Sequence, residues 1–335
     1  MSTCRICQKN DANKTNSHQL PSFLAVMLSS NGSYKRGNAE LMFKMDKYQN
    51  RIYACGLSST KWESTFDDLS EERLKKIIKN PVSEDYVFCS ECEKALGYYI
   101  ESPYGAFYKN GQKINNELPL VFWISVVWRL STQKGNGFSL EEKLEEKLRF
   151  LLNQYLKLQK EGKDASALFH DLNISYQMVN CPDYCKNEGG MFHCDYDREN
   201  QRLTMFIGDI CVSISFIGTD IPENFVFYGM EDYLRQAKTN NGTEQEQRME
   251  VNKETFRQAM KKFVEKAAPI RISGLFEIAD AAWRMTGRFG YMPLRMKIAF
   301  VEKLVADEIK MGERYTNKHF VEAFNTVVNN PFLYV

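Results

Sequence analysis

The feature that most constrains this chain of 335 residues is a pair of Cys-x-x-Cys sequences that lie far apart. Cys4 and Cys7 form the first pair and Cys89 and Cys92 the second, with 81 residues between Cys7 and Cys89. Zn²⁺ prefers four soft ligands in a tetrahedron, and a Cys-x-x-Cys turn directs two thiolates at one ion. The sequence therefore predicts one structural zinc bound by all four cysteines, which forces the two turns to meet. The alternative is that either pair is an incidental pair of buried thiols.

His18 follows the first pair, directly after Ser17, with Pro21 three residues further on. A histidine in this place can complete a metal site, perform acid–base chemistry beside it, or hydrogen-bond to backbone and brace the turn. Because Cys89 and Cys92 supply the two missing zinc ligands, the prediction releases His18 from binding zinc. A catalytic or metal-proximal His18 and a structural His18 both stay open.

Composition limits the compartment and the partners. The N-terminal sequence MSTCRICQKN is polar where a secretion signal would be apolar. The most apolar run, residues 118–130, is too short to span a bilayer. Nine cysteines, an odd number, indicate a reducing cytoplasm, in which paired Cys-x-x-Cys sequences signal metal or redox chemistry. We therefore expect a cytoplasmic protein with no membrane partner.

The pattern of apolar and polar residues predicts an α+β fold. Helices are expected after Pro21, over 68–81, over 118–133 and over 139–162, the last with Ser139 as its N-cap and Gly162 at its end. Two short strands are expected within 40–59, and a short strand leads into Cys89. Residues 171–218 alternate with period two and predict an antiparallel β-meander.

The remaining chain is predicted to be a polar linker or exposed loop followed by helices. The linker covers residues 237–250, and the helical breaks fall at Pro269, residues 287–290 and Pro293. The predicted domains are an N-terminal zinc-knuckle domain (1–135), a helix plus β-meander (136–236) and a C-terminal helical region (251–335). This last region holds 14 Lys and Arg against 9 Asp and Glu, in a chain whose net charge is +1, so its surface can meet phosphate.

A second cysteine group lies in CPDYCKNEGGMFHC and comprises Cys181, Cys185, His193 and Cys194. Four soft ligands within such a short segment are enough for another zinc. Adjacent strand residues point to opposite faces, however, so His193 and Cys194 grip one ion poorly. The alternative is buried strand cysteines next to a hairpin.

Arginines and aromatic residues interleave in the C-terminal segment 271–297. Arginine pairs with phosphate and aromatic rings stack on unpaired bases, which predicts contact with nucleic acid. The alternative is an amphipathic helical bundle whose aromatic residues form the core and whose arginines are solvated. The residues concerned are Arg271, Arg284, Arg288, Arg295 and Lys297, with Phe276, Trp283, Phe289 and Tyr291.

The combination CRIC…TNSHQLPSFL…DYVFCSECEKAL resembles the zinc-containing branch of the HNH, or ββα-metal, nucleases. It is similar more narrowly to bacterial HNH-like proteins with a Ser-His-x-x-Pro motif, a CxxCE knuckle and a downstream Trp-Arg, here Trp128-Arg129. The resemblance covers about residues 1–135. Such proteins are often encoded near mobile elements and phage-defence genes.

The resemblance implies an HNH-like domain that acts on DNA or RNA. It places His18 at the position of the general base and Glu93 at that of a ligand to a catalytic Mg²⁺ or Mn²⁺, while the four cysteines hold a structural zinc. Ser17 stands where the family has a metal-binding acid or histidine, and no Asn stands at the family's middle position before Cys89. The alternative is therefore a catalytically degenerate zinc module that binds nucleic acid or a protein partner, for example in a defence complex.

Overall fold

The computed structural model gives the architecture of this chain in two compact units. The first unit combines residues 1–40 and 79–260, and the second combines residues 41–78 and 261–335. The three-domain division expected from the sequence stays a prediction. The structure describes residues 2–15, 17–18, 20–21, 23–24, 27, 41–45, 50–54, 83–84, 86–132, 139–185, 192–311 and 317–333.

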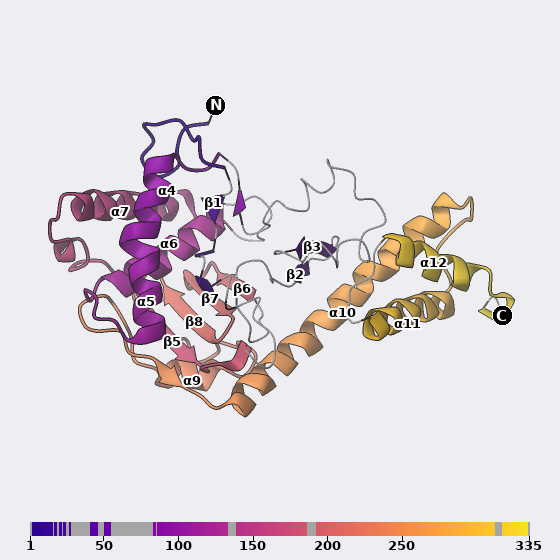
Figure 1. Ribbon diagram of the computed structural model, residues 1–335. Coiled ribbons are helices and arrows are strands. Elements are labelled where there is room, and N and C mark those ends of the chain that lie inside the picture. The colour runs from indigo at the N-terminus through magenta and orange to yellow at the C-terminus, as the bar shows by residue number, and fades with distance from the viewer. Residues whose placement is uncertain are drawn as a thin grey trace. The chain divides into compact units, whose positions relative to one another are not determined.

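A helical column begins at the second Cys-x-x-Cys pair in the first unit. Helix α4 (Ser90–Leu96), the π-helical turn η1 (Gly97–Glu101) and α5 (Ser102–Asn110) follow one another without a break (Figure 1). The column ends at Gly111, whose φ of 67° is left-handed and therefore suits glycine.

Helix α6 (Leu118–Thr132) is the centre of this unit, because almost every residue in it is buried. The ring of Phe122 stacks on that of Tyr104 in α5 with 3.9 Å between centroids. A helix that is apolar on all sides needs neighbours on all sides. The predicted helix over 118–133 is confirmed.

Helix α7 (Glu142–Lys160) carries one apolar stripe, formed by Leu144, Leu148, Leu151, Tyr155 and Leu156, and packs on α6. Its end beside Gly162 agrees with the prediction, since that residue has a φ of 66°. Its start does not. The N-cap is Glu141, and Ser139 lies outside the helix, with the buried Leu140 between them.

The first unit also holds a mixed five-stranded sheet with strand order β6-β7-β8-β5-β9 (Figure 1). The strands are β5 (Ser175–Asn180), β6 (Phe192–Asp197), β7 (Arg202–Ile207), β8 (Ile210–Ser215) and β9 (Met249–Glu250). The ring of Trp123 in α6 lies 6.4 Å from that of Tyr176 in β5, so α6 covers the face of the sheet that carries Tyr176.

The predicted meander is only partly correct. Strands β6, β7 and β8 are antiparallel neighbours in chain order, but β5 pairs with β8 instead of β6. The residues of β5 and β8 are buried throughout, so these strands take interior positions and the half-buried β6 takes the edge.

The segment 237–250, predicted to be a linker or exposed loop, is a mostly exposed loop over residues 238–248, but it is tied to the sheet. Asn240 exchanges two backbone hydrogen bonds with Tyr176, and β9 pairs in parallel with β5. The Glu246 carboxylate is fully buried and accepts hydrogen bonds from the hydroxyls of Tyr104 (3.0 Å) and Tyr176 (2.6 Å). The segment is polar because its polar groups have partners inside the unit.

Two strand pairs precede the second cysteine pair in sequence. β1 (Ser17–His18) pairs antiparallel with β4 (Ser83–Glu84) in the first unit. β2 (Leu41–Met45) and β3 (Asn50–Ala54) pair antiparallel in the second unit, which confirms the two strands expected within 40–59. The helix expected over 68–81 lies outside the described residues.

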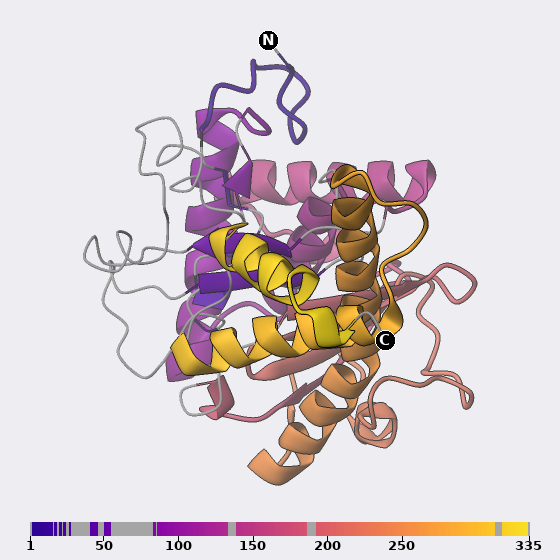
Figure 2. The same ribbon diagram turned by 90° about the vertical axis from the view of Figure 1, so that its right-hand side faces the viewer.

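The described C-terminal part of the second unit is helical. Helix α10 (Lys253–Met285) contains the boundary between the units, and α11 (Leu294–Met311) and α12 (Asn317–Val328) lie side by side (Figure 2). The predicted break at Pro269 is wrong, because α10 runs through this residue. A proline removes one helical hydrogen bond, and the helical turns on either side keep the helix continuous. The breaks at 287–290 and Pro293 are confirmed.

The overall result is an α+β protein, as predicted. Among the described residues, none of the helices is both long enough and apolar enough to cross a membrane.

Candidate metal centre

The four cysteines of the two Cys-x-x-Cys pairs converge, as predicted. The sulfur atoms of Cys4, Cys7, Cys89 and Cys92 all lie within 4.8 Å of one another. Those of Cys7 and Cys89 are 4.0 Å apart, far beyond the disulfide bond length of about 2.05 Å. Four sulfurs at about 2.3 Å from a tetrahedral zinc would be separated by about 3.8 Å. The spacing therefore suits one shared ion and excludes a disulfide between Cys7 and Cys89.

The first turn is shaped by short-range backbone hydrogen bonds. The amide of Cys4 donates to the Asn10 carbonyl (2.8 Å), and the amide of Gln8 donates to the Cys4 carbonyl (2.9 Å). Gln8, the residue after Cys7, has a φ of 53°. This left-handed residue reverses the chain so that both cysteines face the same point.

The second turn is fixed directly to the first by backbone. The backbone amide of Arg5 donates to the Val87 carbonyl (3.0 Å), and that of Lys14 donates to the Phe88 carbonyl (3.0 Å). The backbone amide of Tyr86 donates to the Lys14 carbonyl (2.7 Å). Three interlocking hydrogen bonds join the two segments beside the cysteine cluster. They place the two Cys-x-x-Cys turns next to each other, as one shared ion requires.

The start of α4 supplies N–H donors to the sulfur atoms. Cys89 is the N-cap, and its sulfur accepts the amide hydrogen of Cys92 at 3.5 Å. The side-chain amide of Asn10 donates to the same sulfur at 3.8 Å. Asn13 accepts hydrogen bonds from the amide and hydroxyl of Ser90 at 3.0 Å each. Helix N-termini and N–H donors favour thiolate over thiol, the form that binds metal.

The electrostatics of the cluster are those of a thiolate surrounded by donors. Hydrogen bonding from the Cys92 thiol, with further help from backbone amides of the first turn, lowers the pKa of Cys4 to about 4. Burial raises the pKa of Cys89. The hydrogen bond to Cys4, followed by burial, raises the pKa of Cys92. Zinc binding would therefore release protons from the cluster, because zinc takes cysteine as thiolate.

The donor set fits zinc better than a hard cation. Four sulfur ligands are soft, and Mg²⁺ and Ca²⁺ take oxygen ligands instead. Four protein ligands also complete the tetrahedron, so no position is left for a substrate. The chemistry of this centre is structural.

The turns rest on the apolar interior of the first unit. Ile6 is fully buried, and the ring of Phe88 stacks on that of Trp128 in α6 with 6.0 Å between centroids. Below them Arg129, also buried, forms a 2.5 Å ion pair with Glu101 of η1. Trp128 and Arg129, which contribute to the family resemblance, thus brace the cysteine turns and the helical column from inside.

The other predicted site residues lie on the elements that flank the centre. His18 belongs to β1, with Ser83 of β4 as its register partner. Glu93 lies in the first turn of α4, next to Cys92, and one of its carboxylate oxygens is buried. The hydroxyl of Ser17 is buried without a hydrogen-bond partner among the described residues. The roles predicted for His18 and Glu93 stay predictions.

The second cysteine group does not gather into a metal site in the described part of the chain, where the four-cysteine cluster stands alone. Cys181 and Cys185 are buried among apolar side chains of the sheet cluster, and burial raises the pKa of both thiols. His193 bonds instead through Nε2 to the hydroxyl of Tyr228 (3.0 Å). The alternative of buried strand cysteines is correct only in part, because Cys181 and Cys185 are buried but follow β5, and Cys194 in β6 is partly exposed.

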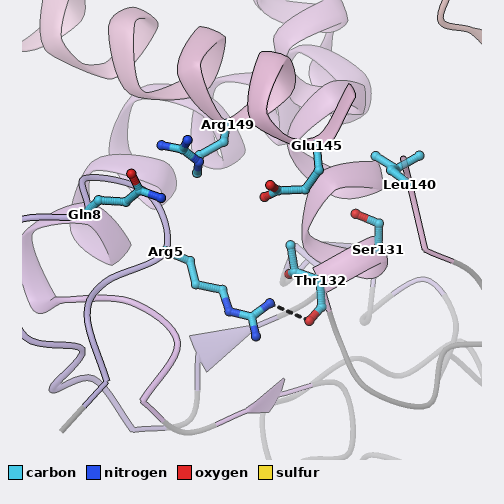
Figure 3. Close-up of a pocket in the computed structure, with 7 residues that line it drawn as sticks. All are labelled: Arg5, Gln8, Ser131, Thr132, Leu140, Glu145 and Arg149. Atoms are coloured by element: carbon cyan, nitrogen blue, oxygen red, sulfur yellow. Dashed lines mark hydrogen bonds between the residues drawn. The ribbon is translucent and has the colours of Figure 1, made fainter. Parts of the chain in front are cut away.

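An open pocket of about 380 Å³ adjoins the first cysteine turn (Figure 3). Arg5 enters it from the turn, where it donates a 2.6 Å hydrogen bond to the Thr132 carbonyl, and Arg149 enters it from α7. Glu145 shares the pocket, but its carboxylate accepts a 2.7 Å hydrogen bond from the indole of Trp128. Sequence analysis missed this pocket, because Arg5 and Arg149 are far apart in sequence and neither belongs to a motif.

Comparisons with protein-family models, with curated proteins and with solved structures found no match to this chain.

Proposed function

We propose that this protein is a zinc-stabilised HNH-like module that acts on nucleic acid. The observation that carries the proposal is the closed four-cysteine cluster at the point where a strand pair meets a helix. The order β1, β4, α4, with one knuckle before β1 and the other opening α4, is the order that the ββα-metal resemblance implies.

The pocket beside the first turn supports an anionic ligand. Arg5 and Arg149 bring two guanidinium groups to an open space, and guanidinium pairs with phosphate through two parallel hydrogen bonds. Within the described residues, Arg149 has no carboxylate at ion-pair distance. A phosphate of the nucleic-acid backbone would supply the missing negative charge.

Cleavage of the nucleic acid is the finer part of the proposal. Here His18 accepts a proton from the attacking water, a task suited to a side chain that titrates near neutrality. Mg²⁺ is commonly held by one or two carboxylates together with substrate phosphates and water, so a single carboxylate, Glu93, suits it. A divalent ion in this position would polarise the scissile phosphate.

A second candidate is a non-catalytic zinc module that binds nucleic acid or a protein partner. The buried hydroxyl of Ser17 favours it, because a neutral buried oxygen cannot replace the acid or histidine that the resemblance expects at this position. For either candidate we propose a role in the cytoplasm in defence against phage, and this part of the proposal rests on the family resemblance alone.

The deciding experiment incubates the purified full chain with DNA and RNA in the presence of Mg²⁺ or Mn²⁺. Wild type and His18→Ala are compared, with His170→Ala as the matched control, since His170 lines a different pocket of the first unit. Removing a general base slows cleavage by about 10²- to 10⁴-fold. His170→Ala is expected to cleave like wild type.

Two results separate the candidates. If wild type and His18→Ala cleave equally, or neither cleaves, the nuclease proposal fails. If wild type nevertheless binds labelled DNA or RNA and Arg149→Gln weakens that binding, the non-catalytic candidate is supported. Loss of both cleavage and binding in wild type refutes the proposed function as a whole.

A further inference from the structure

The connection between α10 and α11 exposes aromatic side chains that sequence analysis could not separate from core residues. In this aromatic loop (residues 286–293), Phe289 is 99% exposed and Tyr291 75% exposed. Trp283, just before the loop, is buried and belongs to the core of the second unit. The segment therefore divides its aromatic residues between core and solvent.

The loop is held in place on both sides of Phe289. Asp280 accepts a hydrogen bond from the amide of Met292 (2.8 Å) and pairs with Lys297 (2.6 Å). The indole of Trp283 donates to the Phe289 carbonyl at 3.4 Å. Gly287 and Gly290 have φ values of 80° and 77°, conformations that only glycine adopts without strain, and they turn the chain before and after Phe289. The exposed ring is thus presented by an anchored backbone.

Positive charge surrounds the exposed rings. From residue 281 to residue 301 the chain has four basic residues and no Asp or Glu. Arg284 lies over the ring of Tyr291 (6.0 Å to its centroid), and Arg288 lies over that of Trp283 (4.7 Å). Lys297 is paired with Asp280, whereas Arg284, which lies over Tyr291, is exposed.

We infer that the aromatic loop binds single-stranded nucleic acid, with Phe289 stacking on an unpaired base and Arg284 contacting a neighbouring phosphate. Single strands carry flat bases next to phosphates, and here the exposed rings of the loop lie close to the exposed Arg284 at the end of α10. An interfacial membrane anchor instead separates a charged face from an apolar one. The inference rests on the proposed function only for the choice of nucleic acid as ligand, because its residues belong to the second unit.

The test measures binding of the full chain to fluorescein-labelled oligo(dT) and oligo(rU) by fluorescence anisotropy. Loss of one stacked base weakens binding by about 5- to 150-fold, which is the change expected for Phe289→Ala. Phe332→Ala is the matched control, since Phe332 is 85% exposed in the same unit and lies outside the aromatic loop. It is expected to bind like wild type.

Two further measurements separate stacking from simple charge attraction. Duplex DNA of equal length is expected to bind more weakly than the single strand and to be insensitive to Phe289→Ala, because its bases are not available. Arg284→Gln is expected to reduce the slope of log K against log salt concentration by about 0.7, the contribution of one phosphate on a single strand.

The inference is overturned if Phe289→Ala binds single strands as tightly as Phe332→Ala does. It is also overturned if the loop is needed instead for binding vesicles of phosphatidylserine and phosphatidylcholine, or if Phe289→Ala changes the molar mass measured by light scattering. If Phe289→Ala binds as tightly as Phe332→Ala, wild type still binds nucleic acid through other residues, so the proposed function survives. If wild type binds no nucleic acid, both this inference and the proposed function fail.

Discussion

Replacing one zinc ligand is the most direct test of the metal centre. Cys89→Ser removes the sulfur that lies 4.0 Å from that of Cys7 and that accepts the amide hydrogen of Cys92. The bound zinc would join residues 7 and 89 and so close a loop of 81 intervening residues. Because the unfolded chain lacks a preformed site, the free energy of zinc binding adds to the stability of the folded state, and structural zinc sites in peptides bind with about 10–16 kcal/mol. We expect loss of zinc to lower the free energy of unfolding by more than about 4 kcal/mol.

The assay combines metal content with denaturant unfolding. Zinc per chain is measured by elemental analysis, and urea unfolding is followed by tryptophan fluorescence, to which Trp128 contributes from its position against Phe88. Wild type is expected to hold one zinc and to unfold at lower urea after chelation, with the slope m unchanged. Cys89→Ser is expected to resemble the chelated protein.

Cys211→Ala is the control, because Cys211 is buried in β8 and lies outside the cluster. It is expected to keep one zinc per chain and to respond to chelation as wild type does. The reasoning is refuted if Cys89→Ser also retains one zinc, or if chelated and untreated wild type unfold at the same urea concentration.

Two further predictions concern the buried polar network of the first unit. Glu246→Gln leaves Arg248 without the carboxylate to which it is paired at 2.6 Å, and should lower the free energy of unfolding by about 3–5 kcal/mol. The control Glu244→Gln changes an exposed residue and should have little effect. Equal urea midpoints for the two variants would contradict this prediction. Burial, and then the negative charge of Glu246, raise the pKa of Tyr104 and Tyr176 well above 10. The folded state therefore keeps protons that the unfolded chain releases, so stability should fall as the pH rises above about 10, with phenolate absorbance of these tyrosines appearing only on unfolding. Phenolate formation by Tyr104 and Tyr176 in the native protein would refute this account.

The sequence was sufficient to predict features set by local pattern or by ligand number. Apolar periodicity located α6 and α7, and alternation located most strands of the sheet. The meeting of Cys4 and Cys7 with Cys89 and Cys92 was predictable because zinc needs four ligands and each pair supplies two. Neither inference required knowledge of tertiary packing.

Features decided by packing were not predictable. The pairing of β5 with β8 could not be predicted, because every residue of both strands is buried. A strand buried on both faces shows no alternation of apolar and polar residues that would indicate its neighbour in the sheet. The polar residues of 237–250 suggested solvent, but Glu246 and Asn240 find their partners in α5 and β5. Likewise, Arg5 and Arg149 share a pocket only because the first cysteine turn lies next to the end of α6 and the first turns of α7.

The wide separation of the two knuckles has little energetic consequence. Compact zinc ribbons place their second pair about 15–20 residues after the first. Each doubling of a loop adds only about 0.6 kcal/mol of closure entropy, so an extension from about 20 to about 80 residues costs about 1.2 kcal/mol. Structural zinc sites supply about 10–16 kcal/mol, which exceeds this cost many times.

The chain between the two knuckles belongs in part to the second unit. The chain leaves the first unit after residue 40, contributes residues 41–78 to the second unit, and returns at residue 79. The pairing of β1 with β4 and the four-cysteine cluster both join the chain before this excursion to the chain after it. Two residues in each strand are too few to hold such a pair alone. We therefore expect zinc to keep β1 and β4 paired, and with them the position of His18 relative to α4.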